Sequence, residues 1–282
     1  MSNSRILVVG ATGYVGKRIV KASLAQGHPT HVLTRREIGF DIEKVQMLLT
    51  FEEQGARLVE GSFSDHQSLV DAVKQVDVVI CAISGVQFRS HNILLQLKLV
   101  DAIKEAGNIK RFLPSEFGMD PSRMGHALEI GKETFGDKMI VRKAIEDAKI
   151  PYTYISANCF AGYFVGGLSQ LDSLMPPRDR VRIYGDGNRK GMVSFMSVWV
   201  VQYVTIFMTS FDLLITFFKT YRFESILVNV EPAIEAAYAR IYHIYYEGCT
   251  MNFEIGEGGE EASKLYPEVR YTRVDEYLRR YL

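Results

Sequence analysis

Short apolar runs alternate with longer amphipathic stretches along the first 155 residues of the chain. The apolar runs have the length and composition of β-strands, and they cover residues 5–9, 30–33, 56–59, 77–82, 111–113 and 152–155. The stretches between them repeat apolar residues at helical spacing, and they cover residues 15–25, 43–53, 67–73, 92–106 and 134–148. Because strands that alternate with helices form parallel sheets covered on both faces, we expect an α/β fold built on a doubly wound parallel sheet.

This alternation ends near residue 158. From residue 192 to residue 218 nearly every position is apolar or aromatic, and Gln202 and Asp212 are the main interruptions. The segment is long enough to span a bilayer, although the two polar residues would be costly there. The alternatives are a buried helix and foreign sequence, such as a translated intron. A segment this apolar promotes aggregation unless it is packed.

The composition argues against partners that are recognised by charge. Thirty-three basic residues balance 33 acidic ones, so no overall field favours nucleic acid or an anionic membrane. The three cysteines, Cys81, Cys159 and Cys249, show neither a disulfide framework nor metal-ligand spacing. We expect reduced thiols and, because the N-terminus lacks a signal-peptide pattern, a cytoplasmic protein without a membrane or nucleic-acid partner.

A glycine-rich loop lies between the first predicted strand and the first predicted helix. It consists of Gly10, Ala11, Thr12, Gly13, Tyr14, Val15 and Gly16. In a dinucleotide-binding loop the first glycine permits a tight turn, the second lets the backbone approach the pyrophosphate, and the third allows close helix–strand packing. The helix N-terminus adds amide donors and a positive dipole. An ordinary βα turn is the alternative, but this position in the chain favours a Rossmann-type nucleotide-binding domain over residues 1–157.

The end of the second predicted strand indicates which dinucleotide binds. An NAD site places an acidic residue there to hold the ribose hydroxyls, whereas this chain has Arg35. A guanidinium can bind a 2′-phosphate in a bidentate manner, and Lys44 is placed to add a second positive charge. Solvated surface cations are the alternative. We expect the cofactor to be NADPH.

Thr134, Lys138 and Arg142 are spaced four residues apart and share one face of the helix predicted over residues 134–148. A lysine buried beside a cofactor can take up or release a proton. From spacing alone a solvent-exposed stripe is the favoured interpretation, because Asp137 and Lys143 make other sides of this helix charged as well.

The histidines His91, His126 and His243 are also candidates for catalysis. None of them has an acidic partner or a second histidine at ligand spacing in the sequence. We therefore expect structural or surface roles for them.

Several segments together resemble the plant isoflavone reductase-like enzymes, an NmrA-type branch of the short-chain dehydrogenase fold. They are the loop 10–16, Pro-Ser-Glu-Phe-Gly at 114–118, the helix around Lys138, and Asn-Cys-Phe-Ala-Gly-Tyr-Phe at 158–164. Residues 86–97 and 108–113 look most like pinoresinol–lariciresinol reductases. The resemblance is nearly continuous from residue 5 to about residue 189, and it resumes from about residue 242 to the end.

The resemblance implies an NADPH-dependent enzyme that reduces the benzylic ethers of phenolic lignans. It implies that Lys138 is the catalytic general base, that Arg35 and Lys44 hold the 2′-phosphate, and that Arg142 contacts the cofactor. Phe160, Tyr163 and Phe164 would then line a dry pocket for a flat aromatic substrate. A homodimer is a candidate assembly.

The chain departs from the family pattern in the smaller C-terminal substrate-binding domain, which we place at residues 158–282. Similarity stops after Lys190, and residues 191–225 are atypical. Relatives place a substrate-contacting histidine where this chain has Arg240. These departures favour foreign sequence as the explanation of the apolar segment, and they suggest a domain that is disrupted.

Two alternatives to a working lignan reductase therefore stay open. The first alternative is a catalytically impaired isoform or a non-enzymatic NADPH-binding protein. The second is an enzyme for related substrates, namely a phenylcoumaran benzylic ether reductase or another isoflavone reductase-like enzyme.

Overall fold

The computed structural model describes residues 3–35, 41–84, 93–157, 159–160, 193–194, 239, 242–243, 255–256 and 258–269. These residues divide into two compact units. The first unit contains the described residues up to Glu116 together with 136–155, and the second contains 117–135 and the remaining described residues. The side chain of Phe160, both Tyr163 and Phe164, and all but two residues of the segment 191–225 lie outside this description.

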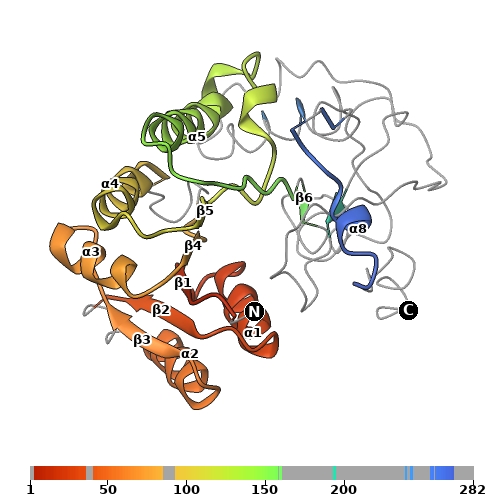
Figure 1. The fold of residues 1–282 in the computed structure, drawn as a ribbon. Helices are drawn as coiled ribbons and strands as arrows, with labels where there is room; N and C mark the ends of the chain where they lie inside the picture. The colour runs from red at the N-terminus through yellow and green to blue at the C-terminus, as the bar shows by residue number, and fades with distance from the viewer. Residues whose placement is uncertain are drawn as a thin grey trace. The chain divides into compact units, whose positions relative to one another are not determined.

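The first unit is built on a five-stranded parallel sheet (Figure 1). Its strands are β1 (Ile6–Val9), β2 (Thr30–Thr34), β3 (Arg57–Glu60), β4 (Val78–Cys81) and β5 (Arg111–Leu113). They lie in the order β3-β2-β1-β4-β5, so the chain reverses its direction of winding between β1 and β4. The predicted Rossmann-type sheet is thereby confirmed.

The sixth strand, predicted over residues 152–155, does not form. Tyr152 makes a single parallel bridge to Phe112 of β5, supported by bonds from Phe112 N to Pro151 O at 2.8 Å and from Thr153 N to Phe112 O at 3.0 Å. Pro151 has no N–H to donate. The segment therefore lies beside β5 without becoming a full strand.

Five long helices connect and cover the strands. They are α1 (Gly16–Ala25), α2 (Ile42–Glu53), α3 (His66–Lys74), α4 (Gln96–Ala106) and α5 (Glu129–Asp147), and the short helices η3 (Ile93–Leu95) and η4 (Pro121–Arg123) precede α4 and α5. Asp41 and Asp65 cap α2 and α3 by accepting bonds from backbone amides. The helix α5 begins earlier than predicted, because its first turn is polar and gives no apolar periodicity.

The main hydrophobic core lies between the sheet and the helices α3, α4 and α5. It joins residues of β1, β4 and β5 to buried residues of the three helices, among them Val70, Leu99 and Ile145. All four residues of β1 are buried, so both faces of the sheet are covered at this central strand. The sheet therefore provides a rigid base for the loops that leave its carboxyl edge.

The described residues of the second unit include a small parallel pair, β6 (Cys159–Phe160) with β7 (Val193–Ser194), and the helix α8 (Ala262–Leu265). His243 is 1% exposed, and its Nε2 accepts a hydrogen bond from Leu128 N at 2.9 Å. The edge of its ring meets the exposed His126. The structural role expected for His243 is confirmed. Among the described residues, no helix is both long enough and apolar enough to cross a membrane.

Candidate functional site

The glycine-rich loop leaves β1 at the point where the winding of the sheet reverses. Gly10 has a φ of +81°, and a Cβ there would lie 2.8 Å from the backbone carbonyl of Ala82, just after β4. A Cβ on Gly16 would lie only 2.1 Å from Gly10 O, and one on Gly13 would lie 3.2 Å from the same oxygen. Side chains are thus excluded where backbone segments meet, as a cradle for a pyrophosphate requires. In the first turn of α1 the amides of Lys17, Arg18 and Ile19 donate to the carbonyls of Gly13 and Val15, so what this turn offers an anion is the positive end of the helix dipole.

The other residues of the glycine-rich loop differ in how far they are exposed to solvent. Ala11 is buried, Thr12 and Val15 are half-buried, and Tyr14 is 37% exposed. Arg18, one turn into α1, donates to Tyr14 O at 2.7 Å and places its guanidinium carbon 3.9 Å from the centre of the Tyr14 ring. A positive charge therefore lies at the N-terminal turn of α1, where it adds to the helix dipole.

The two cations expected to bind the 2′-phosphate are Arg35 and Lys44. In the sequence Arg35 precedes α2, and Lys44 is the third residue of that helix. Arg35 directly follows β2 and is exposed. Lys44 lies in the first turn of α2, and its amine pairs with Asp41, the residue that caps this helix. That hydrogen bond lowers the pKa of the Asp41 carboxyl. Both cations are accessible enough to meet a phosphate, and neither is locked in a buried pair.

The helix face that carries Lys138 is buried. Thr134, Lys138 and Arg142 are each 8% exposed, whereas Met139 and Ile140 between them are largely exposed. The shared face is confirmed, and the interpretation as a solvent-exposed stripe is wrong. That interpretation was based on the charged residues on other sides of α5. Those residues do not indicate which side of the helix is covered by a segment distant in the sequence.

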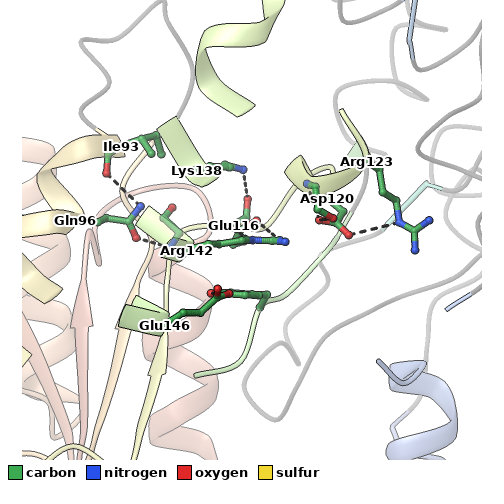
Figure 2. Close-up of polar contacts among 11 residues, drawn as sticks. Ile93, Gln96, Glu116, Asp120, Arg123, Lys138, Arg142 and Glu146 are labelled. Atoms are coloured by element: carbon green, nitrogen blue, oxygen red, sulfur yellow. Dashed lines mark hydrogen bonds and ion pairs between the residues drawn. The ribbon is translucent and has the colours of Figure 1, made fainter. Parts of the chain in front are cut away.

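Glu116 holds both cations of this face (Figure 2). The Lys138 amine donates to the Glu116 backbone oxygen at 2.7 Å. The Arg142 guanidinium donates from Nε and Nη2 to the two carboxylate oxygens of Glu116 at 2.9 and 3.0 Å. The Arg142 guanidinium carbon also lies 4.2 Å from the centre of the Tyr154 ring. One residue therefore binds the lysine by its main chain and the arginine by its side chain.

Buried polar side chains anchor the segment that carries Glu116. It follows β5, and the amide of Ser115 donates to Gln96 Oε1 at 2.7 Å, while the Ser115 hydroxyl donates to Ile83 O at 2.6 Å. Gln96 is only 1% exposed, and its amide donates in turn to Ile93 O (Figure 2). No role was predicted for Gln96, Ser115 or Glu116 individually. The sequence did contain an indication of Ser115 and Glu116, because they follow β5 after Pro114, at the edge where parallel sheets bind ligands.

Two other ionisable groups of the first unit stay protonated. Burial raises the pKa of the Cys81 thiol to about 12, so this cysteine is not a thiolate nucleophile. Burial and the Glu146 carboxylate raise the pKa of Tyr154, whose hydroxyl donates to Glu146 at 3.2 Å. The Lys138 amine, which donates to the Glu116 carbonyl, is a group of a type that can exchange a proton with a ligand.

Comparison with known proteins extends this picture. The sequence profile of the NmrA-like family matches residues 2–184. The chain is 56% identical to an isoflavone reductase homolog of Lupinus albus and 53% identical to a bifunctional pinoresinol-lariciresinol reductase of Sinopodophyllum hexandrum, over the whole of each protein. A solved structure described as AtPrR2 with NADP+ and (+)pinoresinol is 52% identical, with a TM-score of 0.89 and complete coverage of both chains.

The same alignments show that this chain is shorter than its relatives. They extend over 312 and 318 positions, whereas the chain has 282 residues. At least 30 positions of the relatives therefore have no counterpart here. The resemblance to isoflavone reductase-like enzymes is confirmed, and the chain belongs to the NmrA-like family.

Proposed function

We propose that this protein is an NADPH-dependent oxidoreductase that opens the benzylic ether of pinoresinol to give lariciresinol, with lariciresinol as a candidate second substrate. The observation that carries the proposal is the buried Lys138 amine, held on the Glu116 carbonyl in a chain that matches the pinoresinol-containing structure over its full length. A buried, oriented amine suits proton transfer to and from a phenol.

The cofactor would be held by the glycine-rich loop and by Arg35 and Lys44. The loop leaves room for the backbone to approach the pyrophosphate at the positive end of the α1 dipole, and the two cations suit a 2′-phosphate. NADP+ in the related structure supports this choice. The contact between Arg142 and the cofactor rests on the family resemblance alone.

The cofactor supplies a hydride at the nicotinamide ring when it is bound. In the proposed reaction Lys138 takes the proton of the phenol that lies para to the benzylic carbon. Electrons move through the ring and break the benzylic C–O bond, so that the ether oxygen leaves as an alkoxide and a quinone methide remains. The benzylic carbon accepts the hydride, the phenolate regains the proton from Lys138, and the alkoxide takes a further proton from water, so that the reaction consumes one hydride and one solvent proton. The side chains of Phe160, Tyr163 and Phe164 are proposed to line the pocket for the aromatic rings.

The proposal is tested by anaerobic incubation of the protein with NADPH and racemic pinoresinol, followed by chiral analysis of the products. We expect lariciresinol to form with equimolar oxidation of NADPH. Consumption of a phenylcoumaran or an isoflavone with pinoresinol left intact would assign the chain to a sister activity instead.

A second candidate function is NADPH binding without turnover. It is favoured by the atypical segment 191–225, which falls in the region expected to bind the substrate, and by the positions of a relative that have no counterpart in this chain. Tight NADPH binding with no oxidation of NADPH by any of these substrates would favour this candidate. A homodimer and a cytoplasmic location are further proposals that rest on the sequence alone.

A further inference from the structure

We propose that Glu116 is the positioning residue of Lys138, and that the ion pair between Glu116 and Arg142 fixes the carbonyl on which the Lys138 amine is held. This inference deepens the proposed function and rests on it, since it assumes that Lys138 transfers the proton.

The geometry of the carbonyl is set by an unusual stretch of backbone. The Glu116 amide donates to Pro114 O at 2.8 Å, which closes a tight turn of the backbone. The next residue, Phe117, has a φ of +34°. This value lies in the left-handed region of backbone conformation, which residues other than glycine rarely adopt. The peptide plane between Glu116 and Phe117 is thereby turned so that its oxygen meets the Lys138 amine. Backbone strain of this kind persists only where surrounding contacts hold it.

The side chain of Glu116 supplies the strongest of these contacts. Both carboxylate oxygens are bound by Arg142, and the paired side chains are only 4% and 10% exposed. The Tyr154 ring lies against the guanidinium, so the arginine has little freedom to move. Glu116 is attached to α5 at two points one turn apart, by its main chain at Lys138 and by its side chain at Arg142. Two attachments fix the height and the rotation of the carbonyl relative to the helix.

This arrangement also controls charge beside the amine. Arg142 lies four residues after Lys138, where side chains on one helix face are neighbours, and the Glu116 carboxylate compensates its positive charge. Further along, Glu146 accepts from the protonated Tyr154 hydroxyl. The hydrogen bond to the Glu116 carbonyl fixes the direction of one N–H, and with it the rotation of the amine about its Cε–Nζ bond. Small errors in such a direction can lower a reaction rate by about a hundredfold.

The test separates positioning from stability by removing the whole pair. Replacing a buried ion pair by apolar residues of similar volume is often neutral for stability, whereas removing one partner is not. The main variant is therefore the double variant E116M/R142M, and the milder variant is E116Q. The matched control is K143M/D147M, which removes an exposed ion pair from the same helix.

Four quantities are measured: kcat and KM for pinoresinol, the Kd for NADPH, the melting temperature, and the rate at which acetic anhydride acylates Lys138. Acylation is followed by peptide mass spectrometry relative to the exposed Lys132. Modification of the buried Cys81 thiol reports any opening of the sheet. We expect the double variant to melt like the unmodified protein but to lose about tenfold to a hundredfold in kcat. KM for pinoresinol should stay within about threefold, and Lys138 should be acylated several-fold faster because its partner is no longer fixed.

Two outcomes overturn the proposal. A double variant with unchanged kcat would show that the pair contributes only to stability. A tenfold weaker NADPH affinity with unchanged acylation would show that Arg142 acts on the cofactor. If the double variant fails to fold, E116Q is judged by the same criteria, with smaller changes expected. If the unmodified chain reduces no pinoresinol, the proposed function fails, and the acylation of Lys138 still decides whether Glu116 positions it.

Discussion

Arg35 is the single residue on which the choice between NADPH and NADH depends. It directly follows β2, at the carboxyl edge of the sheet where a nucleotide ribose lies in this fold. Its exposed guanidinium can make two charge-assisted bonds to a phosphate, whereas an acidic residue there would repel one. Two further residues are considered individually: Lys138 for turnover, and His31 for the dependence of stability on pH.

We expect Arg35→Ala to weaken NADPH binding by about tenfold to a hundredfold, the value of a hydrogen-bonded charge, and to leave NADH binding nearly unchanged. Fluorescence titration of both cofactors measures the difference. Arg57→Ala is the control, because Arg57 is exposed at the amino end of β3. Equal affinities of the unmodified protein for the two cofactors would contradict the assignment.

Replacing Lys138 by alanine should abolish reduction and leave the Kd for NADPH within a few-fold, since the amine acts on the phenol and not on the phosphates. Single-turnover kinetics and cofactor titration measure the two effects separately. A variant that keeps full turnover would show that this buried lysine has only a structural role.

His31 makes the stability of the first unit depend on pH. The side chain is buried in β2, and its Nδ1 has no hydrogen-bond partner among the described residues. Burial, followed by the positive charges of Arg57 and Arg5, lowers its pKa. The folded protein therefore keeps this ring neutral, whereas the unfolded chain takes up a proton below about pH 6.5. Stability should fall as the pH drops through that value.

Urea unfolding at pH 7.5 and at pH 5 tests this prediction in the unmodified protein and in His31→Leu. The substitution should reduce the loss of stability at acid pH. His66→Gln serves as the control, because His66 is half exposed and bonded to Glu105. An equal loss in both variants would assign the pH dependence to other groups.

At the scale of elements, the helices α1 and α5 each contain a glycine, and the two glycines differ in how much space surrounds them. Gly16 begins α1 and lies against the backbone of the phosphate loop, where a Cβ has no room. Gly136 lies on the exposed side of α5, and apart from its neighbours and the adjacent backbone of the helix no described atom lies within 4 Å of the point that its Cβ would occupy. The first glycine serves packing, and the second only weakens its helix.

Gly16→Ala should therefore push the loop away from α1, lower the free energy of unfolding by about 1–3 kcal/mol and weaken NADPH binding more than tenfold. Gly136→Ala should instead stabilise the protein by about 0.4–1 kcal/mol. Denaturant titration and cofactor binding measure both variants together. A Gly16→Ala protein that binds NADPH normally would contradict the proposed pyrophosphate cradle.

At the scale of the whole molecule, the segment 191–225 and the missing positions decide whether the chain can work as its relatives do. The first unit has its own buried core, so we expect it to fold and to bind NADPH whatever follows. Alignment with a relative leaves at least 30 positions without a counterpart in this chain, and Arg240 is a bulky cation where the family resemblance leads us to expect a neutral imidazole.

We predict that replacing residues 192–225 with the matching segment of an intact relative raises pinoresinol turnover and reduces aggregation. Size-exclusion chromatography and steady-state kinetics measure the two effects. If the unmodified chain is monodisperse and already reduces pinoresinol at about 1 per second or faster, the segment is a working part of the fold.

The sequence by itself determined what depends on neighbouring residues. Short apolar runs located the five strands, and helical periodicity located the main helices. The three spaced glycines of the loop indicated a nucleotide site, and Arg35 indicated the form of the cofactor. The four-residue spacing placed Thr134, Lys138 and Arg142 on one face. Each of these features is local, because side-chain direction and backbone freedom are set within a few residues.

Only the tertiary structure decided which of these features are buried and what they contact. Glu116 lies 22 residues before Lys138 and 26 before Arg142, and no local pattern relates positions so far apart. Local apolarity also predicted a strand at residues 152–155, where the structure forms a single bridge. Burial depends on which distant segment covers a surface, and a single sequence does not state this pairing. The environment of Lys138, and with it the chemistry of the site, is therefore a property of the fold.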